Sequence, residues 1–389
     1  MAAIGAVPRV RAQGTVVAAA LVGLGAVVWL AASAGGPRVG LAALIGFGGG
    51  VALYHASFGF TAAWRRMITQ GRSLGIRAQI VMLGAAIAVF YPLLARGSSF
   101  GIPLAGFVSP VGLALCAGAL LFGVGMQLGG GCGSGTLYTA GGGSPRMMAT
   151  LAAFIAGSAA ATANPLGWMQ WPDIGAYSIV AIAGGWGSLA ITLPALAAVY
   201  WGVALVERAR HGEAQPLWVI KRGDMLHGPW PLLAGAAALA LVNIANLLVL
   251  GRPWGITSAF ALWGAKAAAL AGVDVAHWPY WRDDPSLGAS LFADATSAMN
   301  FGLMLGALAA AGLAHRFQPI WKIPARSLAA ALLGGLAMGI GARLSTGCNI
   351  GAFFSGMASG SLHGLMWIVF AIPGNALGAR LRPWFGMEM

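Results

Sequence analysis

Hydrophobic residues occur along the chain in long runs that short polar or glycine-rich segments interrupt. An apolar helix of about 20 residues spans the ~30 Å hydrocarbon core of a bilayer. The strands of a membrane β-barrel would instead alternate in polarity over about ten residues, and this sequence lacks that pattern. The runs predict membrane helices at 14–34, 38–54, 78–95, 110–128, 147–165, 189–206, 230–250, 294–314, 326–342 and 362–379. We interpret 255–272 as an eleventh, incomplete span. The expected fold is an all-α polytopic integral membrane protein with about 9 to 11 membrane segments.

The composition excludes a water-soluble domain. Hydrophobic residues make up 59% of the chain and charged residues 8%, and the mean hydropathy is +0.80. A soluble domain needs far more charge to cover its surface. Arg9 and Arg11 precede the first apolar run, as they would in a signal peptide. Because that run is long and the cleavage pattern weak, we expect a retained anchor.

Most Lys and Arg residues fall on one side of the membrane when the amino terminus is placed in the cytoplasm. These residues are Arg9, Arg11, Arg65, Arg66, Arg72, Arg77, Arg146, Arg208, Arg210, Lys221, Arg222, Arg316, Lys322, Arg326, Arg380 and Arg382. The bias follows the positive-inside rule and predicts a multi-pass protein of the cell (inner or plasma) membrane with a cytoplasmic N-terminus. The net charge of +13 then reflects topology, so the lipid bilayer is an expected partner and nucleic acid is not.

Glycine runs flank one cysteine inside an otherwise apolar region. The stretch GGGCGSGTLYTAGGGS covers residues 129–144 and contains Cys132. Each glycine costs a helix about 1 kcal/mol relative to alanine. Non-helical backbone at membrane depth persists only where it is buried in protein or lines a wet cavity. We therefore expect short, broken, re-entrant helices here and in the similar stretch STGCNIGAFFSGMASGS at 345–361.

The two cysteine stretches belong to an internal repeat. FGVGMQLGGGCGSGTLYTAGG aligns with LAMGIGARLSTGCNIGAFFSGM, which places Cys132 opposite Cys348, and FGFTAAWRR aligns with WGITSAFALWGAK, which places Gly59 opposite Gly255. The chain then divides into halves at 1–210 and 230–389, joined by a charged cytoplasmic linker at 211–229. Threading puts Gly59 and Cys132 on inward-facing segments and Gly255 and Cys348 on outward-facing ones. Such inverted-topology repeats carry a transport path at their interface.

These motifs resemble the YeeE/YedE family of sulfur-compound transporters over essentially the whole chain. The resemblance implies an hourglass-shaped helical fold and uptake of thiosulfate, with Cys132 and Cys348 handing the ion along the path. One departure concerns the first half, where the family pattern SRFCFT reads ASFGFT. Gly59 stands at the place of a third cysteine, and Cys116 matches no motif and is expected to be a core residue.

A thiol suits such a substrate chemically. Thiosulfate carries a soft terminal sulfur, and a neutral thiol donates to it only weakly, which favours passage over retention. No clustered Cys/His set with metal-ligand spacing occurs, so we expect neither a metal nor a cofactor. The odd number of cysteines is not a disulfide framework, since the chain has three.

The candidate pore residues surround these motifs. They are Cys132, Cys348, Gly131, Gly133, Gly347, Asn349, Thr61, Thr257, Gly59, Gly255 and Tyr138. Asn349 can donate to substrate or cap a broken helix. Thr61 and Thr257 can act as a hydroxyl pair or bond their own helix backbone. Tyr138 can close the pore or only pack.

Five other polar side chains have less specific roles. Lys266 and Arg343 can attract anions or extend to the membrane interface, and we favour the second. Asp294 is expected to cap a helix, and His55 and His363 to be structural.

Two classes of function remain open. The first is a transporter or channel for a small sulfur-containing anion, with thiosulfate as the first candidate and other sulfur or selenium species as alternatives. The second is a membrane sulfurtransferase that forms a cysteine persulfide, which would need an activated thiolate. No Lys, Arg or His lies within five residues of Cys132, so we favour transport and expect no enzyme. A separate cytoplasmic sulfur-carrier protein is a candidate partner.

Overall fold

The computed structural model describes residues 12–218 and 225–389. The expectations that rest on Arg9, Arg11, Lys221 and Arg222 lie outside those residues. The helices are α1 (Gly14–Gly35), α2 (Pro37–Ala56), α3 (Phe60–Gln70), α4 (Leu74–Arg96), α5 (Leu113–Gly129), α6 (Gly133–Gly141), α7 (Pro145–Thr162), α8 (Ile179–His211), α9 (Leu232–Leu250), α10 (Thr257–Leu270), α11 (Ala295–Leu313), α12 (Ala325–Leu344), the π-helix η5 (Asn349–Ser355), α13 (Gly356–Ala358) and α14 (Leu362–Leu381).

Short elements occupy the connections. Two antiparallel ribbons, β1 (Ser98–Ser99) with β2 (Ile102–Pro103) and β3 (Pro110–Gly112) with β4 (Asp173–Ala176), depart from the all-helical expectation. Single 3₁₀ turns are η1 (Trp168–Gln170), η2 (Val275–His277), η3 (Pro285–Leu287), η4 (Leu291–Ala293) and η6 (Arg382–Phe385).

Every apolar run predicted to span the membrane coincides with a helix. Nine segments of the described chain are long and apolar enough to cross a bilayer, which supports a multi-pass membrane protein. The helices at two of the predicted spans, α7 and α10, are not among the nine. α7 is rich in Ala, Gly, Ser and Thr, and it packs against α12 and α10 inside the molecule. α8 is longer than its predicted span, 189–206, and it is kinked at Gly184.

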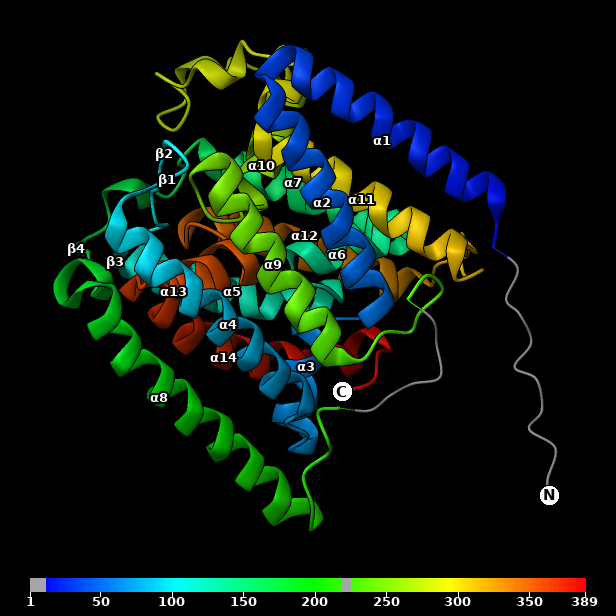
Figure 1. The fold of residues 1–389 in the computed structure, drawn as a ribbon. Helices are drawn as coiled ribbons and strands as arrows, with labels where there is room; N and C mark the ends of the chain where they lie inside the picture. Colours follow the sequence, from blue (N-terminus) through cyan, green and yellow to red (C-terminus); the bar gives the residue numbers. More distant parts are fainter. Residues whose placement is uncertain (1–11, 219–224) are drawn as a thin grey trace.

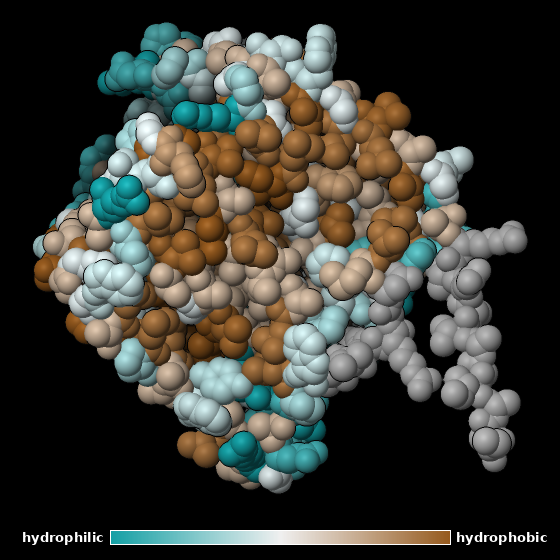
Figure 2. Space-filling model, viewed as in Figure 1, coloured by the Kyte–Doolittle hydropathy of each residue, from teal (hydrophilic) through white to brown (hydrophobic). Residues whose placement is uncertain are grey.

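The face of the molecule seen in Figure 2 is apolar across its middle. In Figure 2, brown hydrophobic residues fill the middle of the visible face, and teal hydrophilic residues gather at its upper-left and lower margins. α1 and α8 run along the periphery in Figure 1, and only 17% and 11% of their apolar windows are buried inside the molecule. Such helices present their side chains to lipid.

Many of the 61 glycines let helix backbones touch. Gly46 and Gly50 of α2 lie against the backbone carbonyls of α11, and Gly302 and Gly306 of α11 lie against those of α2. A Cβ atom at any of the four positions would collide with the opposite backbone. This is the small-residue packing that lipid-embedded helices use, because apolar burial does not drive their association.

The helix contacts recur in pairs along the chain. α2 packs on α11 and α4 packs on α9, while α7 packs on α12 and α14 packs on α5. The central pairs α5–α12 and α2–α9 also touch. The short helix α6 packs beside α7, and η5 with α13 packs beside α14. The contact of α2 with α11 thus has a counterpart in the contact of α9 with α4, and the contact of α7 with α12 has one in the contact of α14 with α5. The helices from α2 to α7 and those from α9 to α14 therefore follow the same order.

A buried ion pair fastens α8 to the rest of the molecule. Glu207 is fully buried near the end of α8 and binds Arg77 of α4 at 3.2 Å and Arg72 at 3.5 Å. Its carboxylate also accepts hydrogen bonds from the Ser73 hydroxyl (2.6 Å) and amide (3.2 Å). The end of α8, just before the linker, is therefore anchored to α4.

Candidate functional site

The two cysteines occupy the same kind of position in the backbone. Each immediately precedes a short helical segment, Cys132 before α6 and Cys348 before η5, and each has an extended conformation with ψ of −169° and −168°. Two residues earlier, Gly130 (φ 89°) and Thr346 (φ 59°) both adopt left-handed backbone. That conformation suits glycine and is rare for a β-branched residue, so the shared geometry is imposed by the surrounding fold.

The segments that start at the cysteines meet head to head. A Cβ atom at Gly133 would lie 2.9 Å from the Cys348 sulfur and 3.5 Å from the Ile256 side chain. Both thiols are free and at most 1% exposed. The Cys132 sulfur accepts a hydrogen bond from the Gly135 amide at 3.5 Å and lies 3.4 Å from the Ser134 hydroxyl. The cysteines therefore lie at the centre of a tight contact.

Two cavities that share no lining residue reach these segments. The first, the Gly255 cavity, has a volume of about 430 Å³ and is lined by Gly255, Ile256, Thr257, Gly347 and Gly351 among others. The second, the Gly59 cavity, has a volume of about 530 Å³, and its lining includes Phe58, Gly59, Ala62, Gln79 and Tyr138. Gly59 and Gly255, which the repeat aligns, thus line separate cavities. Neither cysteine lines either cavity.

The predicted glycines differ in how much room they leave. A Cβ atom at Gly347 would lie 2.7 Å from the Ala352 amide nitrogen, and one at Gly131 would lie 3.0 Å from the Met147 methyl and 3.1 Å from backbone. At Gly255 no atom lies within 4 Å of that position, and at Gly59 the nearest lies at 3.9 Å. Positions 131, 133 and 347 therefore allow close packing, whereas 59 and 255 open into space.

The paired threonines have different environments. The Thr257 hydroxyl accepts a hydrogen bond from the Arg343 guanidinium at 3.1 Å. The Thr61 hydroxyl is buried and has no partner in the described chain, although the Thr61 carbonyl accepts from the Gln127 amide at 3.1 Å. Neither hydroxyl forms a described bond to the backbone of its own helix. Gln127 and Arg343 are each five residues before a cysteine, so the same place in the two cysteine stretches holds a neutral amide in one and a cation in the other.

The position of Arg343 differs from the one that we expected from the sequence. We favoured its extension to the membrane interface, but the side chain is 6% exposed, lines the Gly255 cavity and also donates to the Tyr280 hydroxyl at 3.0 Å. Its Nε atom has no partner among the described residues. Lys266 instead binds the Leu287 and Ala289 carbonyls, each at 2.6 Å, and does not line the cavity. The repeat offset from Gln127 could have indicated that Arg343 lies deep in the protein.

Other predicted residues are placed as follows. Asn349 is 1% exposed, and neither polar atom of its side chain has a partner in the described chain. It forms no helix-capping bond. Cys116 is half-buried in α5 and lines neither cavity. Asp294 caps α11 as expected, since its carboxylate accepts from the Ser297 amide at 2.8 Å.

The two histidines pack inside the protein. The His55 ring packs against Trp230 in a tilted arrangement with a centroid distance of 5.5 Å, and His363 hydrogen-bonds the Ser361 hydroxyl at 2.7 Å. Neither residue lines the two cavities.

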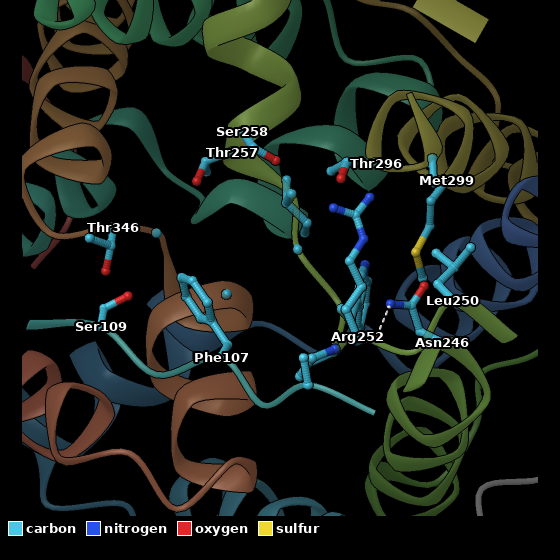
Figure 3. Close-up of a pocket in the computed structure, with 18 of the residues that line it drawn as sticks. Phe107, Ser109, Asn246, Leu250, Arg252, Thr257, Ser258, Thr296, Met299 and Thr346 are labelled. Carbon is cyan, nitrogen blue, oxygen red and sulfur yellow. Dashed lines mark hydrogen bonds between the residues drawn. The ribbon is translucent and has the colours of Figure 1, made fainter. Parts of the chain in front are cut away.

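Several polar residues at the cavities carry no motif and were missed from the sequence. Figure 3 shows Arg252 extending toward Thr296, with its backbone carbonyl bound to the Asn246 amide. The Asn246 carbonyl oxygen has no partner in the described chain. Arg252 adds a second cation to the Gly255 cavity, beside Arg343. Both cavities can therefore receive an anion, because the Gly59 cavity is lined by Arg66 and Arg72.

Comparison with known proteins gives consistent matches. A family model described as Sulphur transport matches residues 55–377. A protein named Probable transporter YedE from Escherichia coli (strain K12) is 29% identical over 151 residues, which is 39% of this chain and 37% of that protein. A protein of the same name from Salmonella typhimurium (strain LT2) is 30% identical over 163 residues, which is 42% of this chain and 39% of that protein. The chain thus matches less than two fifths of the length of these curated relatives.

Proposed function

The chain belongs to the Sulphur transport (YeeE/YedE) family, and from this premise we propose that it carries a small sulfur-containing anion, thiosulfate first, across the membrane. The proposed path runs from the Gly255 cavity, past Cys348 and Cys132, to the Gly59 cavity. Asn349, Thr61, Thr257 and Tyr138 line its narrow part or its mouths.

The proposed architecture is a pair of inverted-topology halves, 1–210 and 230–389, joined by the linker 211–229. The matched order of helix contacts and the shared backbone geometry at Gly130 and Thr346 support it. In such repeats the short broken segments enter from opposite faces, and the substrate passes where they meet. α6 and η5 are the re-entrant segments in this proposal.

The distribution of Lys and Arg residues predicts which side of the membrane each cavity faces. With a cytoplasmic N-terminus in the inner or plasma membrane, the Gly59 cavity faces the cytoplasm and the Gly255 cavity faces outward. Arg252 and Arg343 then concentrate anions at the outer mouth, since cavity walls of low dielectric strengthen the field of the lining charges.

One observation carries the proposal: two buried, free thiols lie at the contact between α6 and η5, and a cavity lined by cations reaches each segment. A thiol can accept the soft sulfur end of the ion without the strong binding that a buried cation would impose. Uptake of ³⁵S-labelled thiosulfate into proteoliposomes tests the proposal, with sulfate, sulfite and selenate as competitors. Uptake no faster than in protein-free liposomes would refute it.

The competing function is that of a sulfurtransferase. Its product, a cysteine persulfide, would distinguish it from a transporter. Persulfide chemistry needs a thiolate activated by a base or a cation. The only described hydrogen-bond partners of the Cys132 thiol are the Ser134 hydroxyl and the Gly135 amide. Mass spectrometry after exposure to thiosulfate would detect a stable persulfide if the protein were such an enzyme. The same measurement on a mixture of this protein with a cytoplasmic sulfur carrier would detect sulfur passed to that partner.

A further inference from the structure

The Gly59 cavity contains a buried amide that the described chain does not satisfy. Gln79 lies six residues after Ser73, the residue that precedes α4, and its side chain is 3% exposed. Neither its Nε2 nor its Oε1 atom has a hydrogen-bond partner among the described residues, yet the residue lines the cavity. Leaving a buried amide unpaired costs about 1–3 kcal/mol, so such a group calls for a ligand.

The corresponding amide in the second half has a structural partner. Asn300 lies six residues after Asp294, the residue that caps α11, and α11 takes the place of α4 in the helix order. Its Nδ2 atom donates to the Ile256 carbonyl at 3.0 Å. The equivalent carbonyl in the first half belongs to Phe60, and Gln79 forms no described bond to it. At this position the side-chain N–H group therefore binds the backbone in the second half and has no described partner in the first half.

The surroundings of Gln79 favour an oxyanion. Arg66 is exposed at this cavity, Arg72 also lines it, and Tyr138 contributes a phenol. No cysteine lines it, and Gly59, which does, stands where the family pattern SRFCFT has a cysteine. An amide N–H and a phenol O–H donate to oxygen more strongly than a thiol does.

We propose that Gln79 is the centre of an oxyanion subsite in the Gly59 cavity, where the oxygen end of the transported ion is bound after its sulfur leaves the two cysteines. This inference rests on the proposed function and assigns the step next to Gly59 to oxygen recognition. The Gln79 amide and the Tyr138 hydroxyl donate to the oxyanion. Arg66 supplies the attracting charge, and Arg72, which also pairs with Glu207 at 3.5 Å, adds to it.

The test replaces the amide by an apolar group of the same length. We expect Gln79→Met to lower thiosulfate counterflow in proteoliposomes about tenfold. The melting temperature without anion should stay unchanged or rise, because an unpaired buried amide has been removed. A structural amide would give the opposite result, a lower melting temperature.

A matched control lies in the same cavity. Gln215 lines it but is exposed, so Gln215→Met should transport as the wild type does. Wild-type counterflow in Gln79→Met, or a fall in its melting temperature, would overturn the subsite. Thermal stabilisation by sulfate tests it without transport: Gln79→Met should lose part of the wild-type shift, and an undiminished shift would count against it. Absence of counterflow in the wild type would instead contradict only the proposed function.

Discussion

The sulfur of Cys348 lies against Gly133, the residue that follows Cys132, and a Cβ atom at Gly133 would be 2.9 Å from it. Contacts this short force a neighbour to move. We expect Gly133→Ala to reduce thiosulfate uptake strongly and to destabilise the protein by about 1–3 kcal/mol. Uptake into proteoliposomes and the melting temperature in detergent measure the two effects.

Gly255→Ala is the control for this change, because no atom lies within 4 Å of the added methyl group. It should fold normally and retain uptake. Equal behaviour of the two alanine variants would show that the contact at Gly133 does not matter.

The thiols give the second prediction. Loss of one weak S–H donor removes about 1 kcal/mol of binding, or about fivefold in affinity. We expect Cys132→Ala and Cys348→Ala to lower uptake by at least that factor and Cys116→Ala to be near neutral, since Cys116 lines neither cavity. Growth on thiosulfate as the sole sulfur source, and uptake kinetics, report the effect.

Serine variants show what the sulfur contributes. If Cys132→Ser transports and Cys132→Ala does not, hydrogen bonding is sufficient. If both fail, the softness of sulfur is required. If Cys116→Ala alone abolished uptake, the assignment of Cys132 and Cys348 would be wrong.

Labelling from the two sides of the membrane gives the third prediction. Both Gly59 and Gly255 have room for a side chain that opens into a cavity. In a Cys116→Ala background, Gly59→Cys should react with an impermeant maleimide only in inside-out vesicles, and Gly255→Cys only in intact cells. The background protein shows how far the two buried native thiols react. Reaction of both introduced cysteines from one side would exclude the inverted repeat.

The cation of the Gly255 cavity gives the fourth prediction. Arg343→Gln places in the second half the residue that the first half has at Gln127. Hydrogen bonds to a charged group contribute about 1.5–3 kcal/mol, so we expect the apparent affinity for thiosulfate to fall about 10- to 150-fold. Uptake measured against external concentration gives the value.

Lys266→Gln separates this effect from simple loss of charge. Lys266 binds two loop carbonyls and does not line the cavity, so its loss should lower the melting temperature and leave affinity unchanged. An affinity of Arg343→Gln equal to that of the wild type would contradict a role in attracting the anion.

The positions of the helices could be predicted from the sequence because each apolar run has about the length that a helix needs to span a bilayer. Runs such as 14–34 and 362–379 agree with α1 and α14 to within two residues, since a bilayer sets the length and glycine or proline marks the ends. The kink at Gly184 could not be foreseen, because the glycines at 184, 185 and 187 suit close helix packing as well as a break in the helix.

The site was only partly predictable. Cys132 and Cys348 stand out because glycine surrounds them, and the repeat places them opposite each other. Arg343 and Gln79 do not stand out, since a polar residue near the end of an apolar run has the same pattern whether it faces lipid headgroups or a cavity. Their positions depend on contacts between distant segments, such as that of Arg343 with Tyr280.

The glycine contact between α2 and α11 has a mechanical consequence. Parting these two helices would break backbone-to-backbone packing at Gly46, Gly50, Gly302 and Gly306 at once, and all of its dispersion energy would be lost together. The corresponding contact between α4 and α9 has no glycine of either helix against the other. We therefore expect the molecule to be stiff along one flank and compliant along the other, so that any widening of the path pivots about α2 and α11 while α4 and α9 spread.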